Sequence, residues 1–474
     1  MLRLCLRSNI RHFLNGLPKS LDDTYERILK GIPEENRSHV HRILQCLAVA
    51  FRPLSVDELA AILTSNPDAI EGEVPMVDVY FRPEDQEQEL LSACPSLITI
   101  VASGRSRVVQ FSHFSVKEFL MSDRLAASED ISRFHILPNA AHTTFARASL
   151  GFLLHLDDRV IGRNGTSIPL AMYAAEYWVS HAQVGDVSSR VMGTMKTLFD
   201  SDKPHFAVWL RIYDIDNYWS RSKTARPLYI SALCGFYDLV EHLVKTHPQD
   251  VNAIGGTHDF PLVAALLKGH IRVAELLFQR GADVSIQGTM KQVPLHRAVE
   301  WPRHFAVGAI QFLLSHGADV DAQDKDNSTP LHWASFFLDL ELARTLLDHG
   351  ANVNAGDNRG RISLHRALGS EYDSDEDRFG VVKLLMERGA DVNALNEDHE
   401  TPLHLASRLV SFTVTWFLLK RGADPNVENG EGKLPFQLAR ESIRKEMGQQ
   451  MPSAYSLRRG WRAQGVALMG LLYN

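Results

Sequence analysis

Cysteine is scarce in this sequence. Cys5, Cys46, Cys94 and Cys234 are spread over 474 positions, and no two of them have the short spacing of a metal-binding or redox pair. Small secreted proteins that depend on disulfides carry many more. This usage favours reduced, buried thiols in an intracellular chain, either cytoplasmic or nuclear.

Long apolar runs are also missing. No stretch approaches the roughly 20 apolar residues that a membrane-spanning helix requires, and the apolar segment 465–473 is too short. We therefore expect no association with a membrane.

The signatures of common enzyme classes are absent as well. The sequence contains no Gly-x-x-x-x-Gly-Lys-Ser/Thr loop, no His-Glu-x-x-His, no Gly-x-Ser-x-Gly and no Cys-x-x-Cys. These strings supply a phosphate cradle, zinc ligands with a base, an exposed nucleophile and a redox pair. We expect no enzymatic activity, no cofactor and no bound metal.

Charge of one sign does not dominate. Lysine and arginine number 50 against 57 aspartates and glutamates, a net charge of −7. A nucleic-acid-binding chain usually carries a basic excess, so bulk affinity for nucleic acid is not expected. The length indicates two or three domains.

What the chain does contain is a repeated Gly-Ala-Asp or Gly-Ala-Asn motif. Its glycines lie at 281, 317, 350, 389 and 422, so that successive copies are 36, 33, 39 and 33 residues apart. A period near 33 residues indicates a repeat architecture, in which each unit buries its apolar face only against its neighbours. We predict a solenoid with one long concave surface.

Each repeat has the signals of two helices and a hairpin loop. Thr329-Pro330-Leu331-His332 and Thr401-Pro402-Leu403-His404 place a capping Thr before a Pro in the first turn, where its missing donor is harmless. A second apolar stretch ends in a cation and a glycine, as in Arg388-Gly389, which is typical of a helix that stops at a left-handed residue. Polar turn residues then lead into the next repeat.

At these residues the chain resembles the ankyrin repeat family. The resemblance covers residues 221–450, with about seven repeats whose ends are degenerate, and leaves 451–474 as a tail. It implies that the concave face and the hairpin tips bind another protein.

The half before the repeats has different signals. Ser55-Val56-Asp57-Glu58 is a capping box, in which a hydroxyl and a carboxylate each satisfy a backbone amide at a helix start. Two apolar stretches, 97–101 and 108–111, flank Ser103-Gly104-Arg105-Ser106 and predict a β-hairpin. Helices followed by a hairpin predict a winged helix within residues 1–125, followed by a helical domain over 126–220.

Two stretches here resemble the region that follows the nucleotide-binding module of fungal NACHT-ankyrin proteins. They are Leu17-Pro18-Lys19-Ser20-Leu21-Asp22-Asp23-Thr24-Tyr25-Glu26-Arg27-Ile28-Leu29 and His113-Phe114-Ser115-Val116-Lys117-Glu118-Phe119-Leu120. The resemblance implies a signal-transducing protein of the STAND type. Because the phosphate-binding loop is absent, this chain is not expected to bind ATP by itself, and the presence of an upstream nucleotide-binding domain stays open. The expected fold class is mostly α: a winged-helix and helical N-terminal module followed by an ankyrin-repeat α-solenoid.

Two constellations imitate metal sites. His296, His332, His365 and His404 recur with the repeat, but stacked repeats would hold them about 10 Å apart, too far to share one ion; the ankyrin resemblance implies that they stabilise neighbouring turns. Segment 373–377 imitates a calcium loop, yet Arg378 stands where that loop requires glycine. We expect an acidic, solvated loop there.

The ankyrin resemblance also implies which residues contact a partner. Phe336 and Phe337 stand where small or polar residues are usual, either as exposed anchors or as core filling, and both alternatives stay open. The full predicted set is Trp301, Lys325, Asp326, Phe336, Phe337, Asn358, Arg359, Glu397, Asp398, Ser407 and Arg408.

The predicted function is therefore non-enzymatic binding of a protein partner by the ankyrin face, in an arm resembling that of a NACHT-type signalling protein. The alternative is a DNA-binding regulator in which the winged helix contacts duplex and the repeats recruit a partner. Its candidate recognition helix, 55–64, carries Asp57 and Glu58 and no cation, which opposes phosphate binding, and only Arg105 and Arg107 on the wing favour it.

Overall fold

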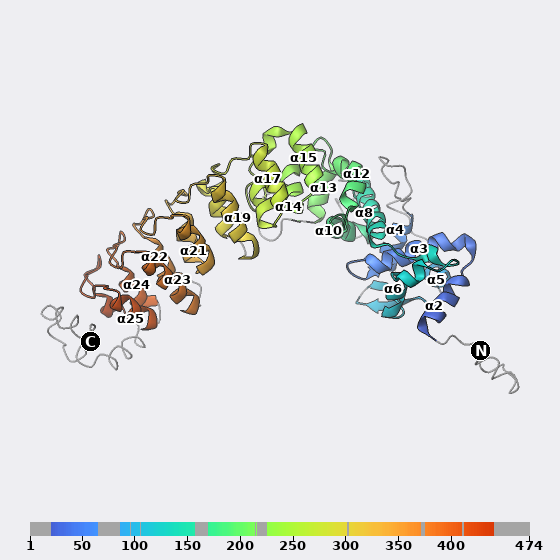
Figure 1. The fold of residues 1–474 in the computed structure, drawn as a ribbon, viewed down its shortest axis with the longest axis horizontal. Coiled ribbons are helices and arrows are strands. Elements are labelled where there is room, and N and C mark those ends of the chain that lie inside the picture. The colour runs from blue at the N-terminus through green and yellow to red at the C-terminus, as the bar shows by residue number, and fades with distance from the viewer. Residues whose placement is uncertain are drawn as a thin grey trace, which may run out of the picture. The chain divides into compact units, whose positions relative to one another are not determined.

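The computed structural model describes residues 20–64, 86–94, 96–104, 106–156, 169–213, 215, 225–300, 303–370, 375–409 and 412–439. The chain divides into two compact units, Met1–Trp219 and Ser220–Asn474 (Figure 1). The finer domain boundaries drawn from the sequence stay predictions. Among the described residues, no helix combines the length and apolar character that crossing a bilayer requires.

The first unit begins with a winged-helix arrangement. Its helices are α2 (Leu21–Lys30), α3 (Glu34–Val49), α4 (Val56–Thr64), α5 (Gln86–Ala93) and α6 (Phe114–Leu120), and its strands are β1 (Leu54–Ser55), β2 (Ile98–Ser103) and β3 (Ser106–Phe111). β2 and β3 form the predicted hairpin, and β1 pairs antiparallel with the other edge of β3. The sequence does not predict β1, because two residues cannot show an alternating pattern.

A helical layer completes the first unit. It comprises α7 (Asp123–Ala126), the 3₁₀ turn Ser132–Phe134, α8 (Pro138–His155), α10 (Pro169–Ala182), α11 (Val187–Arg190), α12 (Met192–Leu198) and α13 (His205–Ile212). α10 packs on α8, and its Tyr173 and Trp178 are fully buried together with Trp209 of α13. The indole of Trp209 donates to the carbonyl of Ala175 at 2.9 Å, so its polar atom is satisfied inside the core.

The capping box at the start of α4 is confirmed and is part of a larger contact. Glu58 N donates to Ser55 Oγ at 3.1 Å, and Ser55 N donates to Glu58 Oε2 at 2.8 Å. The buried Glu58 carboxylate also accepts two hydrogen bonds from Arg52, at 2.9 and 2.6 Å. The guanidinium of Arg52 in turn lies 4.9 Å from the ring centre of Tyr173. One carboxylate therefore connects the winged helix to α10.

The expected burial of the cysteines is confirmed for the three described thiols. Cys46, Cys94 and Cys234 are buried and form no disulfide. Burial raises the pKa of Cys46 and of Cys94 to about 12, which keeps both protonated and unreactive at neutral pH. Cys5 lies outside the described residues.

The second unit is a stack of helix pairs. The first helices are α14 (Pro227–Cys234), α16 (Pro261–Leu267), α18 (Pro294–Glu300), α20 (Pro330–Phe336), α22 (Ser363–Leu368) and α24 (Pro402–Leu409). Their partners are α15 (Tyr237–Thr246), α17 (Ile271–Gln279), α19 (Arg303–Ser315), α21 (Leu340–Asp348), α23 (Asp375–Glu387) and α25 (Phe412–Lys420), and the short α26 (Pro435–Leu438) follows. Short 3₁₀ turns lie at Pro248–Asp250 and Thr289–Lys291. The helix starts predicted from the Pro-Leu-His and Ser-Leu-His strings are confirmed.

The acidic segment 373–377 differs from its prediction. Asp375, Glu376 and Asp377 form the first turn of α23 rather than a loop. Carboxylates are favourable at a helix N-terminus because they face its unsatisfied amides, and this local preference explains the difference. Asp373 and Ser374 lie outside the described residues.

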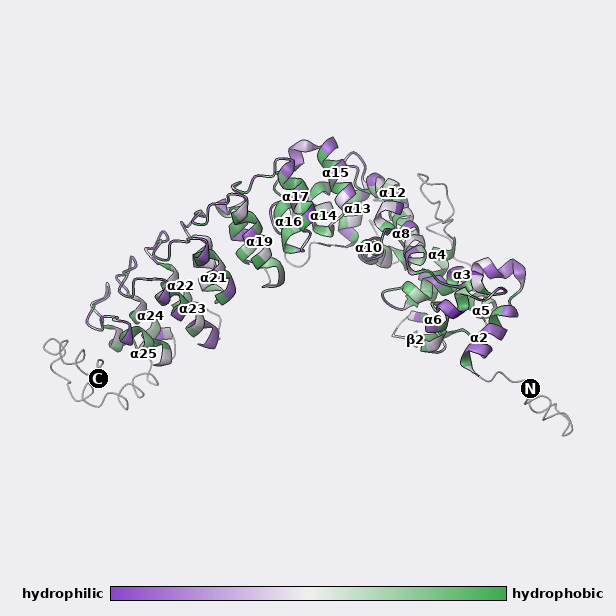
Figure 2. Cartoon of the chain, viewed as in Figure 1, coloured by the Kyte–Doolittle hydropathy of each residue, from purple (hydrophilic) through white to green (hydrophobic). Residues whose placement is uncertain are grey.

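Hairpin loops join successive pairs along one edge of the stack, and the turns within each pair lie along the opposite edge (Figure 1). The hairpins are largely hydrophilic, whereas the helices alternate between hydrophilic and hydrophobic faces (Figure 2). The predicted left-handed stops are confirmed: the five motif glycines have φ of 95, 87, 89, 86 and 93°. We call the two sides the hairpin edge and the turn edge.

Breaking the Arg52–Glu58 pair should destabilise the first unit. Glu58→Ala is expected to lower the free energy of unfolding by about 2–4 kcal/mol, because it removes a helix cap and leaves the Arg52 guanidinium without its charged partner. Asp57→Ala, an exposed change in the same turn, should cost less than about 1 kcal/mol. Urea unfolding followed by tryptophan fluorescence measures both, and equal losses would contradict the structural role of the pair.

Two glycines separate backbone strain from packing. Gly235 ends α14 with φ 76°, and a Cβ there would lie 2.5 Å from the His270 ring of the next repeat; Gly281 has φ 95° and open space around it. Gly281→Ala should therefore destabilise by roughly 1–2 kcal/mol from the left-handed backbone alone. Gly235→Ala should lose at least about 1 kcal/mol more, from overpacking. Equal losses in urea unfolding would show that His270 moves aside freely.

Candidate protein-binding face

Four histidines join the start of each repeat to the loop of the next. Nδ1 of His332 accepts from Thr329 N at 3.1 Å, and its Nε2 donates to the carbonyl of Arg361 at 2.9 Å. The equivalent Nε2 donations run from His296 to Ser328 O, from His365 to Glu400 O and from His404 to Lys433 O, at 2.9, 3.1 and 3.2 Å. A backbone amide can only donate and a carbonyl can only accept, so each ring is neutral with its proton on Nε2. Both nitrogens are occupied, which leaves neither for a metal.

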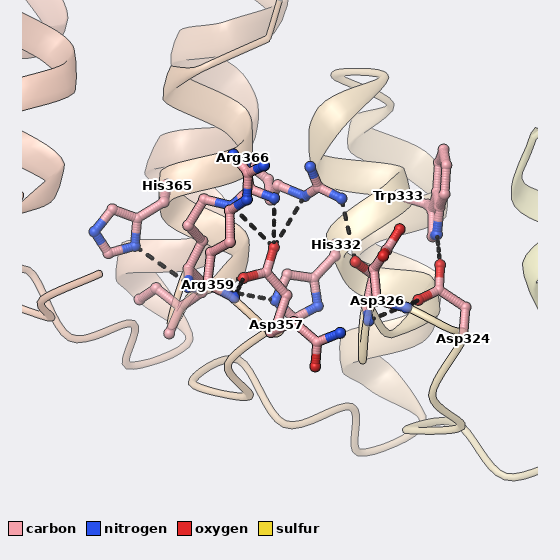
Figure 3. Close-up of polar contacts among 12 residues, drawn as sticks. Asp324, Asp326, His332, Trp333, Asp357, Arg359, His365 and Arg366 are labelled. Carbon is pink, nitrogen blue, oxygen red and sulfur yellow. Dashed lines mark hydrogen bonds and ion pairs between the residues drawn. The ribbon is translucent and has the colours of Figure 1, made fainter. Parts of the chain in front are cut away.

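Carboxylate and amide side chains shape the hairpins that follow. Asp357 Oδ1 accepts from the amides of Arg359 and Arg361 at 2.9 and 3.0 Å, and Asp324 Oδ1 accepts from those of Asp326 and Ser328 at 2.8 and 2.9 Å (Figure 3). Burial alone would raise the pKa of the Asp357 carboxyl, but the Arg361 side chain and these amides outweigh it and the pKa is lowered. A charged Asp357 therefore holds its hairpin in one conformation.

The hairpin tips project from these turns as one row. Asn358 N donates to Asp326 O at 2.9 Å, and Glu397 N donates to Arg359 O at 2.8 Å, so each tip is hydrogen-bonded to its neighbour. The row brings together predicted contact residues of both charge signs, all of them exposed: Lys325, Asp326, Asn358, Arg359, Glu397 and Asp398.

An aromatic cluster lies on the first helix of the central repeat. The rings of Phe336 and Phe337 are 5.5 Å apart, and Phe337 lies 5.9 Å from Trp333. Both phenylalanines are half-buried, which is intermediate between the exposed anchor and the core filling considered from the sequence. The buried Leu338 takes φ 56° at the end of this helix, where equivalent repeats have Gly235 and Gly269.

Arg366 contacts both this cluster and a hairpin turn, and Figure 3 shows it beside Asp357. Its guanidinium is 5.8 Å from the Phe336 ring centre, its Nη2 donates to Ser328 Oγ at 3.2 Å, and its Nε is 3.7 Å from Asp357 Oδ2. Burial, together with the neighbouring Arg361, lowers the pKa of Arg366. The face therefore combines aromatic rings with a positioned positive charge.

The remaining predicted residues have separate positions. Arg408 forms an ion pair with the buried Glu400 at 2.7 Å. Ser407 is only 2% exposed, so its side chain is not available to a partner; it points into the stack because its helix position faces the neighbouring repeat. Trp301 lies outside the described residues.

Family models match both units. One described as ankyrin repeats in three copies matches residues 228–324 and 295–394, and one described as ankyrin repeats in many copies matches 381–439. This chain carries ankyrin repeats. A third, described as the winged helix domain of GPI inositol-deacylase, matches residues 25–132 and confirms the winged helix.

Several curated proteins are similar to parts of this chain. Azaphilone pigments biosynthesis cluster protein L of Monascus ruber is 32% identical over 300 residues, 57% of this chain and 61% of that protein. Vegetative incompatibility protein HET-E-1 of Podospora anserina is 26% identical over 275 residues, 52% of this chain and 17% of that protein. Mouse inversin is 33% identical over 185 residues, 38% of this chain and 17% of that protein. The matched part of the chain thus covers at most 61% of the length of any of these three relatives.

These matches confirm the ankyrin and fungal NACHT-type resemblances drawn from the sequence. An ankyrin architecture is typical of protein-binding chains without enzymatic activity.

The wing does not present free cations for DNA among the described residues. Arg107 is ion-paired with Glu87 at 2.6 Å, and Arg105 lies outside the described residues. On α4, Glu58 is committed to Arg52 and Asp57 is exposed. No observation here favours the DNA-binding alternative.

Trp333 and Arg366 were not predicted as part of the face. A sequence signal for them exists: each follows the histidine of a Leu-His-x-Ala string, at a position of the first helix that faces the hairpins. The string alone does not tell how far such a side chain stands out, because that depends on the neighbouring repeat.

Acid should destabilise the ankyrin repeats through their histidines. Burial lowers the pKa of His296, His332, His365 and His404, and the hydrogen bond to a carbonyl offsets it only in part. In the unfolded chain a histidine has a pKa of about 6.5. Below that pH the unfolded chain therefore binds more protons than the folded chain. The contribution of these neutral histidines to the free energy of unfolding is complete above about pH 6.5 and is lost as the pH falls below it.

The double variant His332→Gln/His365→Gln tests this origin. Gln437 already occupies the equivalent place in the last copy, where its Oε1 accepts from Leu434 N at 2.8 Å. At pH 7.5 the variant should be less stable than the parent by about 1 kcal/mol per missing hydrogen bond. Between pH 7.5 and 5.5, however, its free energy of unfolding in urea should fall less than that of the parent. Parallel losses would assign the acid sensitivity to other groups.

Proposed function

We propose that this chain is a non-enzymatic binding protein whose ankyrin unit captures a protein partner between the first helices and the hairpin tips. The residues proposed to make contact are Lys325, Asp326, Phe336, Phe337, Asn358, Arg359, Glu397, Asp398 and Arg408, to which the geometry adds Trp333 and Arg366. Trp301 belongs to the proposal from its sequence position only.

The observation that carries the proposal is the half-buried aromatic cluster on the first helix of the central repeat. Half-buried rings provide large contact area while losing little side-chain freedom, and such residues dominate interface energies. The mixed charges of the exposed tips form a polar rim, which favours register and specificity with a protein over general attraction to nucleic acid.

A signalling role is the second part of the proposal. The winged-helix match, the ankyrin matches and the similarity to HET-E-1 support an arm resembling that of NACHT-type proteins, in which the repeats bind and the first unit transmits. The chain would then act inside the cell, and its Arg52–Glu58 contact would keep the transmitting unit rigid.

The proposal is tested by affinity capture and mass spectrometry with the full chain as bait. Phe336→Ala/Arg359→Ala removes one anchor and one tip while sparing Arg408, whose loss would leave Glu400 buried and unpaired. We expect the partner to bind this variant at least about tenfold more weakly than the parent, as for an anchor residue.

Phe114→Ala is the matched control, because it removes a ring that is 70% exposed in the first unit and not in the ankyrin unit. Circular dichroism must first show equal folding of all baits. A partner retained by parent and control and lost by the double variant supports the proposed face. The same proteins captured by all three baits would contradict it.

A further inference from the structure

An apolar stripe runs along the turn edge of the ankyrin unit, opposite the hairpin tips. Tyr237, Ile271, Phe305 and Leu340 are 36, 40, 49 and 37% exposed. Tyr237, Ile271 and Leu340 are the first residues of α15, α17 and α21, and Phe305 lies in the first turn of α19. Four successive repeats therefore each present one large apolar side chain at the same place, which we call the turn-edge stripe.

The stripe is continuous from repeat to repeat. The Phe305 ring lies against Gly269, where an added Cβ would be 2.7 Å away, and Leu340 Cδ2 would be 3.5 Å from a Cβ on Gly380 of α23. At the other end, the guanidinium of Arg272 is 5.2 Å from the Tyr237 ring centre. Phe305 and Leu340 thus each lie against an adjacent repeat, and Arg272 connects the repeat of Ile271 to Tyr237. The four side chains therefore follow one another along the edge rather than being scattered.

The two repeats that flank Phe305 carry opposite charge. Lys268 and Arg272 are exposed beside Ile271, whereas Asp238 is the one acid in the first turn of α15. Beside Leu340 lie the exposed Glu341 and the acidic first turn of α23, in which Asp375 is paired with Arg378. A surface that is basic in the repeat before Phe305 and acidic in the repeat after it is complementary to itself at those two repeats when the second copy is reversed.

We propose that the turn-edge stripe is the interface of a homodimer with a two-fold axis at Phe305. In a two-fold interface, a residue one repeat before the axis faces a residue one repeat after it. Phe305 then stacks on Phe305 of the partner subunit, Ile271 packs on Leu340 of the partner subunit, and Arg272 faces Glu341 of the partner subunit.

The size of the stripe sets the expected strength. Adjacent repeats are about 10 Å apart, so four repeats span about 30 Å and give an interface near the small end of specific ones. We expect a dissociation constant on the order of tens of micromolar. Because the stripe lies on the turn edge, the dimer leaves both rows of hairpin tips open to partners and makes the protein bivalent.

Sedimentation velocity of the full chain tests the dimer between about 1 and 300 µM at low salt. The parent is expected to associate reversibly. Arg272→Glu and Glu341→Arg should each weaken association at least about tenfold, since each sets like charges face to face twice per dimer. The double variant Arg272→Glu/Glu341→Arg restores both pairs and should return to within about threefold of the parent.

Two further variants complete the test. Phe305→Ser should abolish association without unfolding, because the ring is half exposed, and circular dichroism checks the fold. Arg359→Ala, at an exposed hairpin tip, should leave association unchanged. A parent that is monomeric throughout, a dimer that resists Phe305→Ser, or a double variant as weak as the single ones would overturn the proposal.

Discussion

The ankyrin unit depends on a hydrogen bond that no repeat can make alone. In four repeats, a buried imidazole accepts from the amide that starts its own helix and donates to a carbonyl in the next repeat. The two bonds of each ring satisfy a backbone amide at a helix start and fix the position of the following hairpin. Both require a neutral imidazole. Because each pair of helices buries its apolar side only on its neighbours, the order of the stack is set by these contacts.

The same stacking gives the unit two edges of different chemistry. On the hairpin edge, buried side chains such as Asp357 hold turns whose tips are exposed and charged. On the turn edge, helix starts present Ile271, Phe305 and Leu340 to solvent. A polar rim and an aromatic cluster are suited to a selective partner, whereas an apolar stripe with opposite charges in the two repeats that flank Phe305 is suited to a second copy.

The first unit is held together differently, by one buried carboxylate instead of a repeated bond. Glu58 caps α4, pairs with Arg52 and through it contacts Tyr173 of α10. The winged helix and the helical layer therefore share a charged contact at their junction. The Glu58 carboxylate of α4 is therefore buried inside the unit and is not part of an outward-facing surface.

The amino-acid sequence by itself determined the features that depend on local backbone chemistry. These include the helix starts at Pro-Leu-His strings, the left-handed glycine stops, the capping box at Ser55 and the hairpin after Cys94, because each is fixed by residues a few positions apart. Only the tertiary structure decided how far Phe336 and Phe337 are exposed, that Ser407 is buried, that β1 exists and that the exposed residues of four helix starts form one stripe. Those properties depend on which distant segment covers a side chain, and neither periodicity nor propensity encodes that neighbour.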